Sequence, residues 1–83
     1  MPEQKMTTRK LSLIRDGQSA TISYFDMPES DSDRLSAMGL FVGQHVLKKH
    51  SQPMKGPVSL QLNGSNIAIS SRLASHIMVE IDE

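Results

Sequence analysis

The sequence predicts a single, mostly β domain, in which about five short antiparallel strands close into a small barrel with one short helix. The chain has 83 residues, which is enough for one hydrophobic core and not for two. Apolar residues alternate with polar ones in short runs, and turn signals separate the runs roughly every eight to twelve residues. We expect the sheet to close because a small open sheet leaves two edges unpaired.

The chain is predicted to begin with a flexible tail. Residues 1–10 are polar and show no apolar periodicity, which is typical of a mobile terminal segment. Leu11 and Leu13 then alternate with a serine and indicate a first short strand. The predicted domain therefore covers residues 11–83.

A second strand is predicted over residues 19–25, after a turn at Asp16-Gly17. Side chains two positions apart on a strand point to the same face. The residues expected on the inward face are Ala20, Ile22 and Tyr24.

One helix is predicted between roughly Ser30 and Met38. Serine and aspartate side chains at its start are suited to accept hydrogen bonds from the free N–H groups of the first turn. Leu35 and Met38 are three positions apart and share a face, so both are expected in the core. Gly39 suits the left-handed conformation that ends a helix, and Leu40 is expected to close over that end.

The remaining strands are predicted in the C-terminal half. A weakly patterned strand is expected over residues 44–50, with Val46 inward, and a long loop over residues 51–57. The hairpin around Asn63-Gly64 is the strongest pattern, because both residues tolerate the positive φ of a type I′ turn. The inward residues of this hairpin and of the last strand are expected to be Val58, Leu60, Leu62, Ile67, Ile69, Ile77, Val79 and Ile81.

The amino-acid composition excludes several classes of function. The chain has no cysteine, which excludes disulfides, thiolate metal sites and cysteine nucleophiles and fits a reducing cytoplasm. Nine basic residues balance nine acidic ones, so no net charge holds the chain on nucleic acid or on an anionic membrane. The N-terminus carries no apolar stretch, so neither a signal peptide nor membrane insertion is expected. No serine stands in a nucleophile-elbow context, and we predict no enzyme activity and no cofactor.

Three segments of the sequence form a specific pattern. Residues 34–43 read RLSAMGLFVG, residues 67–69 read IAI, and residues 73–79 read LASHIMV. In this order the three segments resemble the FeoA family of bacterial ferrous iron transport. The similarity runs from about Leu11 to Ile81, and the order and spacing of the three segments are its most specific feature.

The resemblance implies an SH3-like barrel in the cytoplasm and a regulatory partnership with the cytoplasmic region of FeoB, the membrane transporter with a GTP-binding domain. The same module is similar to the C-terminal domain of DtxR-type repressors. The alternative interpretation is therefore an SH3-like ligand-sensing or scaffold domain of a metal-dependent transcriptional regulator. In either role we expect a monomer or a weak oligomer.

Two clusters of potential metal ligands lack the spacing of a metal site. His45 and His50 are five positions apart, so on one strand they point to opposite faces, and His76 belongs to another element. The acidic run from Glu29 to Asp33 lacks the glycine and the distant glutamate of a calcium loop, and helix capping explains it better. We therefore expect no functional metal site.

A basic cluster could suggest nucleic-acid binding, but the aromatic platform for stacked bases is missing. Only three aromatic residues occur in the chain. The cluster, which is expected to be a solvated strand face, consists of Lys48, Lys49, His50 and Lys55.

The predicted partner-binding residues are apolar ones placed in turns. Leu40 and Phe41 follow the helix, and Met54 lies between a proline and a lysine in the long loop. Exposed apolar residues of this kind are candidates for interaction sites. The simpler alternative is that Leu40 and Phe41 only cover the end of the barrel.

Overall fold

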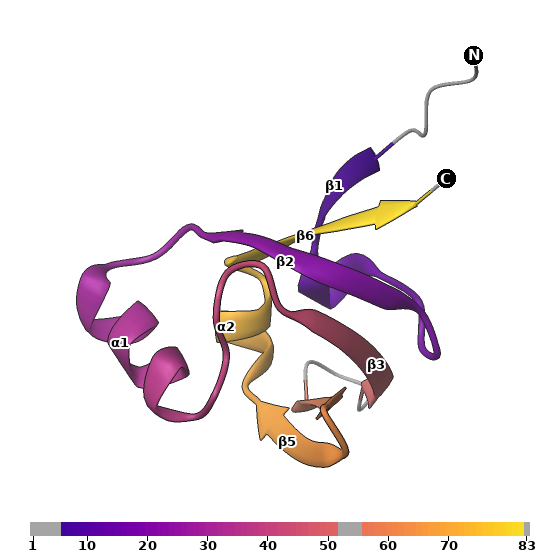
Figure 1. The fold of residues 1–83 in the computed structure, drawn as a ribbon. Coiled ribbons are helices and arrows are strands. Elements are labelled where there is room, and N and C mark those ends of the chain that lie inside the picture. Colours follow the sequence, from indigo (N-terminus) through magenta and orange to yellow (C-terminus); the bar gives the residue numbers. More distant parts are fainter. Residues whose placement is uncertain (1–5, 52–55, 83) are drawn as a thin grey trace.

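The computed structural model describes residues 6–51 and 56–82. Their strands form one six-stranded sheet with the order β1-β6-β2-β3-β4-β5, and every pairing is antiparallel (Figure 1). The elements in chain order are β1 (Met6–Lys10), the 3-10 helix η1 (Leu11–Leu13), β2 (Ser19–Phe25), α1 (Glu29–Ala37), β3 (His45–Ser51), β4 (Val58–Leu62), β5 (Ser65–Ile69), α2 (Ser71–Ala74) and β6 (Ile77–Asp82).

The sheet has two end strands, β1 and β5. Within the described residues no pairing joins these two strands, so the predicted closed barrel is not confirmed. The N-terminal and C-terminal strands β1 and β6 lie side by side, away from the hairpin of β4 and β5 (Figure 1). The predicted class of a mostly β, antiparallel domain with one short helix is confirmed, but the sheet has six strands where about five were predicted.

The prediction of a tail over residues 1–10 is wrong for its second half. Met6–Lys10 forms β1 and pairs with β6 from Met6 opposite Asp82 to Lys10 opposite Met78. An edge strand can be held by main-chain hydrogen bonds with little apolar periodicity, and Thr8, Arg9 and Lys10 are all exposed. Residues 1–5 lie outside the described part of the chain.

The first predicted strand is instead the 3-10 helix η1. Leu11 is fully buried, whereas Leu13 is 69% exposed, so the two leucines do not share a face. The next apolar residue, Ile14, is buried with Leu11. In a helical turn residues three apart lie on one side, which explains why Ile14 and not Leu13 joins the core.

Strand β2 has the predicted bounds but not the predicted inward face. Ala20 and Ile22 are buried, whereas Tyr24 is 50% exposed. The pairing register between β2 and β6 shifts between Ile22 and Tyr24, because a β-bulge adds one residue there. After the bulge Phe25 packs against the core in place of Tyr24.

Helix α1 was predicted to within one residue at each end, but not its capping or its buried side. Pro28 is the N-cap residue, and no side-chain hydrogen bond caps the helix, so the predicted serine and aspartate caps are wrong. Leu35 is buried as expected, whereas Met38 is 39% exposed. Leu40 fills the core position at this end of the helix instead of Met38.

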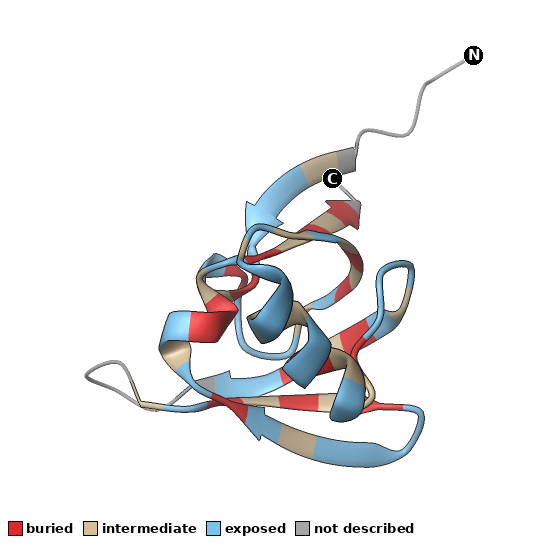
Figure 2. Cartoon of the chain, turned by 90° about the vertical axis from the view of Figure 1, so that its left-hand side faces the viewer, coloured by how far each residue is buried: buried red, intermediate tan, exposed pale blue. Residues whose placement is uncertain are grey.

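The hairpin of β4 and β5 follows the prediction closely. Asn63 and Gly64 have φ values of 47° and 82°, as a two-residue type I′ turn requires. Figure 2 shows the buried residues on the strands and both helices, with exposed residues around them. Of the predicted inward residues after residue 57, Ile67 is partly buried against the core, and those that are buried are Val58, Leu60, Leu62, Ile69, Ile77, Val79 and Ile81.

Candidate functional site

The chain leaves α1 through a tightly hydrogen-bonded end. The N–H of Leu40 donates to the carbonyl of Leu35, and the N–H of Gly39 donates to the carbonyl of Ser36, both at 3.0 Å. These two bonds form a Schellman motif, which requires a left-handed residue at the position of Gly39, where φ is 98°. In this motif the residue after the glycine folds back onto the helix, so Leu40 packs into the core.

The next four residues form a turn that is attached to β2. The N–H of Gln44 donates to the carbonyl of Phe41 at 3.2 Å, and the N–H of Phe41 donates to Gln44 Oε1 at 3.3 Å. On the β2 side, the N–H of Gly43 donates to the carbonyl of Ile22 at 2.8 Å, and the N–H of Ile22 donates to the carbonyl of Gln44 at 2.9 Å. The turn is therefore held in place at both ends.

Three apolar side chains are exposed between the end of α1 and this turn. We call these residues, Met38, Phe41 and Val42, the apolar corner. Phe41 is 53% exposed and Val42 is 59% exposed, and Met38 precedes them at the end of the helix. Because main-chain hydrogen bonds fix the turn, a partner that binds here orders little backbone. Val42 was not among the predicted residues, although the positive φ of Gly43 after it is typical of an exposed turn.

The structure separates the three residues predicted to bind a partner. Phe41 is exposed as expected. Leu40 is fully buried in the core and is not available to a partner. The prediction that Leu40 binds a partner is therefore wrong. Met54 lies outside the described residues.

Lys48 is the buried polar residue of the described core. It is 2% exposed, and its Nζ donates to the carbonyls of Ser12 at 3.1 Å and Ile14 at 2.7 Å. Its main chain bonds the same segment, with the N–H donating to the carbonyl of Gln18 and the carbonyl accepting from the N–H of Gly17. Burial lowers the pKa of Lys48 from its usual 10.5, and the nearby charge of Asp16 opposes this shift. The residue therefore holds η1 and the start of β2 against β3.

Almost the whole described domain matches a known protein family. The family described as the FeoA domain matches residues 9–81 of the chain. The chain belongs to the FeoA family. Its sequence resemblance to that family is thereby confirmed.

Individual proteins are similar to this chain in sequence or in fold. A protein of Methanocaldococcus jannaschii named as an Fe(2+) transport protein A is 34% identical over 70 residues, which cover 84% of this chain and 83% of that protein. The crystal structure of an iron uptake regulatory protein, FeoA, matches with a TM-score of 0.79 at 24% identity, over 90% of this chain and 99% of that one. A manganese-dependent transcriptional repressor matches with a TM-score of 0.82 at 18% identity, over 95% of this chain and 44% of the repressor. The two structures show a shared fold.

The basic cluster is smaller in this FeoA domain than the sequence suggested. Lys48 points into the core, so only Lys49 and His50 of the described members are exposed. The register between β3 and β4 shifts between Lys48 and His50, and this bulge turns consecutive residues to the outside. Lys55 lies outside the described residues.

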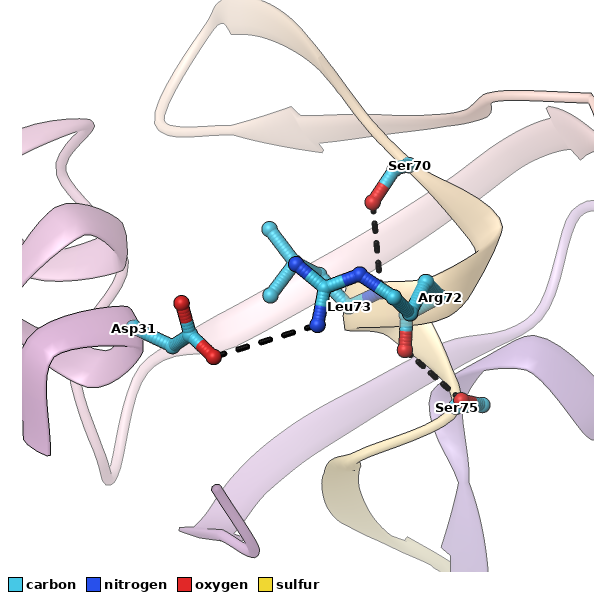
Figure 3. A network of polar contacts seen from close by, with 5 residues as sticks. All are labelled: Asp31, Ser70, Arg72, Leu73 and Ser75. Atoms are coloured by element: carbon cyan, nitrogen blue, oxygen red, sulfur yellow. Dashed lines mark hydrogen bonds and ion pairs between the residues drawn. The ribbon is translucent and has the colours of Figure 1, made fainter. Parts of the chain in front are cut away.

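The histidines and the acidic run do not come together in the described structure. His45, His50 and His76 are all exposed. In residues 6–51 and 56–82, no three histidine, aspartate or glutamate side chains gather to hold a metal ion. Asp31 of the acidic run instead lies 3.8 Å from Arg72 and links α1 to α2 (Figure 3).

Flanking serine residues cap both ends of the short helix α2. Ser70 Oγ accepts from the N–H of Leu73 at 3.2 Å, and Ser75 Oγ donates to the carbonyl of Arg72 at 2.7 Å (Figure 3). These bonds hold the main chain of α2, from which the side chain of Arg72 reaches Asp31 of α1. No helix in the described part of the chain is both long and apolar enough to span a membrane.

Proposed function

We propose that this FeoA-family chain is a cytoplasmic accessory protein of ferrous iron uptake that regulates the FeoB transporter by binding its cytoplasmic region through the apolar corner. The observation that supports the site is the exposure of Phe41 and Val42 in a turn whose main chain is hydrogen-bonded to β2. A regulator that carries out no chemistry acts through the difference in its affinity for two states of the partner. No catalytic step is part of this proposal.

The apolar corner fits a small interface. Aromatic side chains lose few rotamers on binding and are enriched among residues that dominate interface energy. A domain of this size is expected to offer roughly 500 to 800 Å² to a partner, with one or two anchors that carry most of the affinity. Phe41 is the expected anchor, Met38 and Val42 are the other members of the apolar corner, and Met54 stays a predicted contact.

The second candidate function is a ligand-sensing or scaffold domain of a metal-dependent transcriptional regulator. The fold shared with the manganese-dependent repressor supports it, although that likeness concerns the fold alone. A neighbouring gene for a large GTP-binding membrane transporter would favour the accessory role. A fused or neighbouring helix-turn-helix domain would favour the regulator.

Phe41→Asp is expected to weaken binding to the purified cytoplasmic region of FeoB by about five- to thirtyfold, which corresponds to about 1 to 2 kcal/mol. The new carboxylate would lose its hydration at the interface and gain no partner there. Isothermal titration calorimetry measures the affinity, and circular dichroism checks that the variant stays folded.

Leu13→Asp is the matched control, because Leu13 is 69% exposed and belongs to η1, outside the corner. This control should bind as tightly as the natural chain. If Phe41→Asp and Val42→Asp both fold and bind normally, the corner is not the docking site. If the natural chain does not bind the cytoplasmic region of FeoB, the proposed partner is wrong.

A further inference from the structure

The two end strands of the sheet differ in how they are protected against pairing. β1 carries Arg9 and Lys10, and charged side chains on an edge strand discourage the addition of another strand. β5 reads SNIAI, with no charge, no proline and no pairing irregularity with β4. Among residues 6–51 and 56–82, no strand pairs with its outer side. β5 therefore has the features of an edge that accepts a strand.

The register of the hairpin shows which main-chain groups of β5 face outward. Leu62 and Ser65 flank the two-residue turn and form the first hydrogen-bonded pair. Hydrogen-bonded and non-hydrogen-bonded pairs then alternate along the ladder. Asn66 and Ala68 fall in non-hydrogen-bonded pairs, so their N–H and C=O groups point away from β4 and toward the open edge.

A hollow lies on the outer face of the same strands. Its volume is about 340 Å³, and its lining residues are Lys49, His50, Ser59, Asn66, Ile67 and Ala68. None of these six is acidic, and two of them are basic. Asn66 and Ala68, whose main chains face the open edge, thus also border a basic hollow.

Short side chains separate the basic residues from the edge. His50 pairs with Ser59, and Ser59 pairs with Ala68, so one row crosses β3, β4 and β5. Neighbouring strands are about 4.8 Å apart, so a strand added beside β5 would lie roughly 14 Å from β3. A glutamate that reaches over Ala68 would face His50 across Ser59, and Lys49, in the bulge next to His50, lines the same hollow.

We propose that the outer edge of β5 binds an extended acidic peptide segment of a partner protein as an added antiparallel or parallel strand. Main-chain hydrogen bonds to Asn66 and Ala68 hold the segment, and Lys49 and His50 select acidic side chains on the face above the hollow. Charge complementarity is the reason for choosing an acidic occupant. This second docking surface is separate from the apolar corner.

Two synthetic peptides test the proposal by nuclear magnetic resonance titration of the labelled full chain. The acidic peptide is acetyl-TVEVEVT-amide, and the basic one replaces both glutamates by lysine. We expect the acidic peptide to shift the amide signals of Asn66 and Ala68, to protect them from hydrogen exchange, and to bind at least about tenfold more tightly than the basic one. Failure of the acidic peptide to affect these two amides would contradict the proposal.

Variants distinguish the contribution of main-chain hydrogen bonds to peptide binding from the contribution of charge. Ala68→Pro removes the outward N–H, which an edge strand tolerates, and should abolish binding, whereas Ala68→Ser keeps the N–H and should retain it. Lys49→Glu should reverse the preference between the two peptides even if Ala68→Pro does not fold. Phe41→Asp should bind the acidic peptide as the natural chain does, so this result is independent of the proposed FeoB interface.

Self-association is the competing outcome. If the Asn66 and Ala68 amides become protected as the concentration of the chain alone rises, and Ala68→Pro abolishes this effect, the edge binds a second copy of the chain. That result would overturn the acidic-segment proposal. Unchanged preference between the peptides in Lys49→Glu would also overturn it.

Discussion

Leu40→Asp is expected to unfold the domain. Leu40 is fully buried at the end of α1, where the Schellman motif turns it into the core. An aspartate there would be buried among apolar side chains without a partner, which costs more than about 4 kcal/mol. The whole stability of a domain this small is about 5 kcal/mol. Thermal unfolding followed by circular dichroism should show no cooperative transition for this variant near room temperature.

The adjacent residue gives the matched control. Phe41 is 53% exposed, so Phe41→Asp should change the free energy of unfolding by less than about 1 kcal/mol. If Phe41→Asp unfolds the domain instead, the ring belongs to the core and the apolar corner is wrong. If Leu40→Asp melts like the natural chain, the burial of Leu40 is wrong.

The second large effect is expected from Lys48→Glu, with a loss of about 3 to 5 kcal/mol. The ammonium group of Lys48 donates to the carbonyls of Ser12 and Ile14, and a glutamate would bring a negative charge to the same two oxygens. Both carbonyls would lose a donor, and the new carboxylate would have none. Urea denaturation measures the loss, and the slope of the transition checks that it stays two-state.

Lys49→Glu is the control for charge reversal at the next position. The side chain of Lys49 is exposed, so this variant should stay within about 0.5 kcal/mol of the natural chain. Equal losses for Lys48→Glu and Lys49→Glu would show that net charge, and not the buried site of Lys48, controls stability.

Lys48 should also make the free energy of unfolding depend on pH in the alkaline range. Burial lowers the pKa of Lys48 in the folded chain below its usual 10.5. Below the folded-state pKa the group is charged in both states, so the cost of burying the charge is constant. Between that pKa and 10.5 the unfolded chain binds more protons, so the free energy of unfolding rises with pH. Above this window the group is neutral in both states.

Lys48→Met removes this titration while keeping the length of the side chain. Over the window below 10.5, the stability of the natural chain should therefore rise relative to that of Lys48→Met. The difference between the two unfolding free energies cancels the titration of the other residues that both chains share. Parallel pH profiles for the two chains would contradict the lowered pKa.

The candidate site could be predicted from the sequence only in part. The segment from Met38 to Gly43 has two glycines around apolar residues, which indicates a turn with apolar groups near solvent. Which of these groups turns inward depends on the bonds that end the helix. The fold-back of Leu40 buries it and leaves Phe41 and Val42 outside.

The sequence by itself determined the elements whose signals are local. The alternation in β4, β5 and β6 places their inward residues, and Asn63-Gly64 specifies the two-residue turn because few other residues adopt its positive φ. Gly39 likewise marks the end of α1. Each of these features depends on conformational preferences within a few neighbouring residues.

Only the tertiary structure decided the features that depend on distant segments. β1 forms because β6, more than sixty positions along the chain, offers it a row of main-chain partners. The bulge opposite β6 turns Tyr24 outward, and the carbonyls of Ser12 and Ile14 make it possible to bury Lys48. A pattern along one strand cannot encode these outcomes, since the free energy of each comes from hydrogen-bond partners that meet only when the chain has folded.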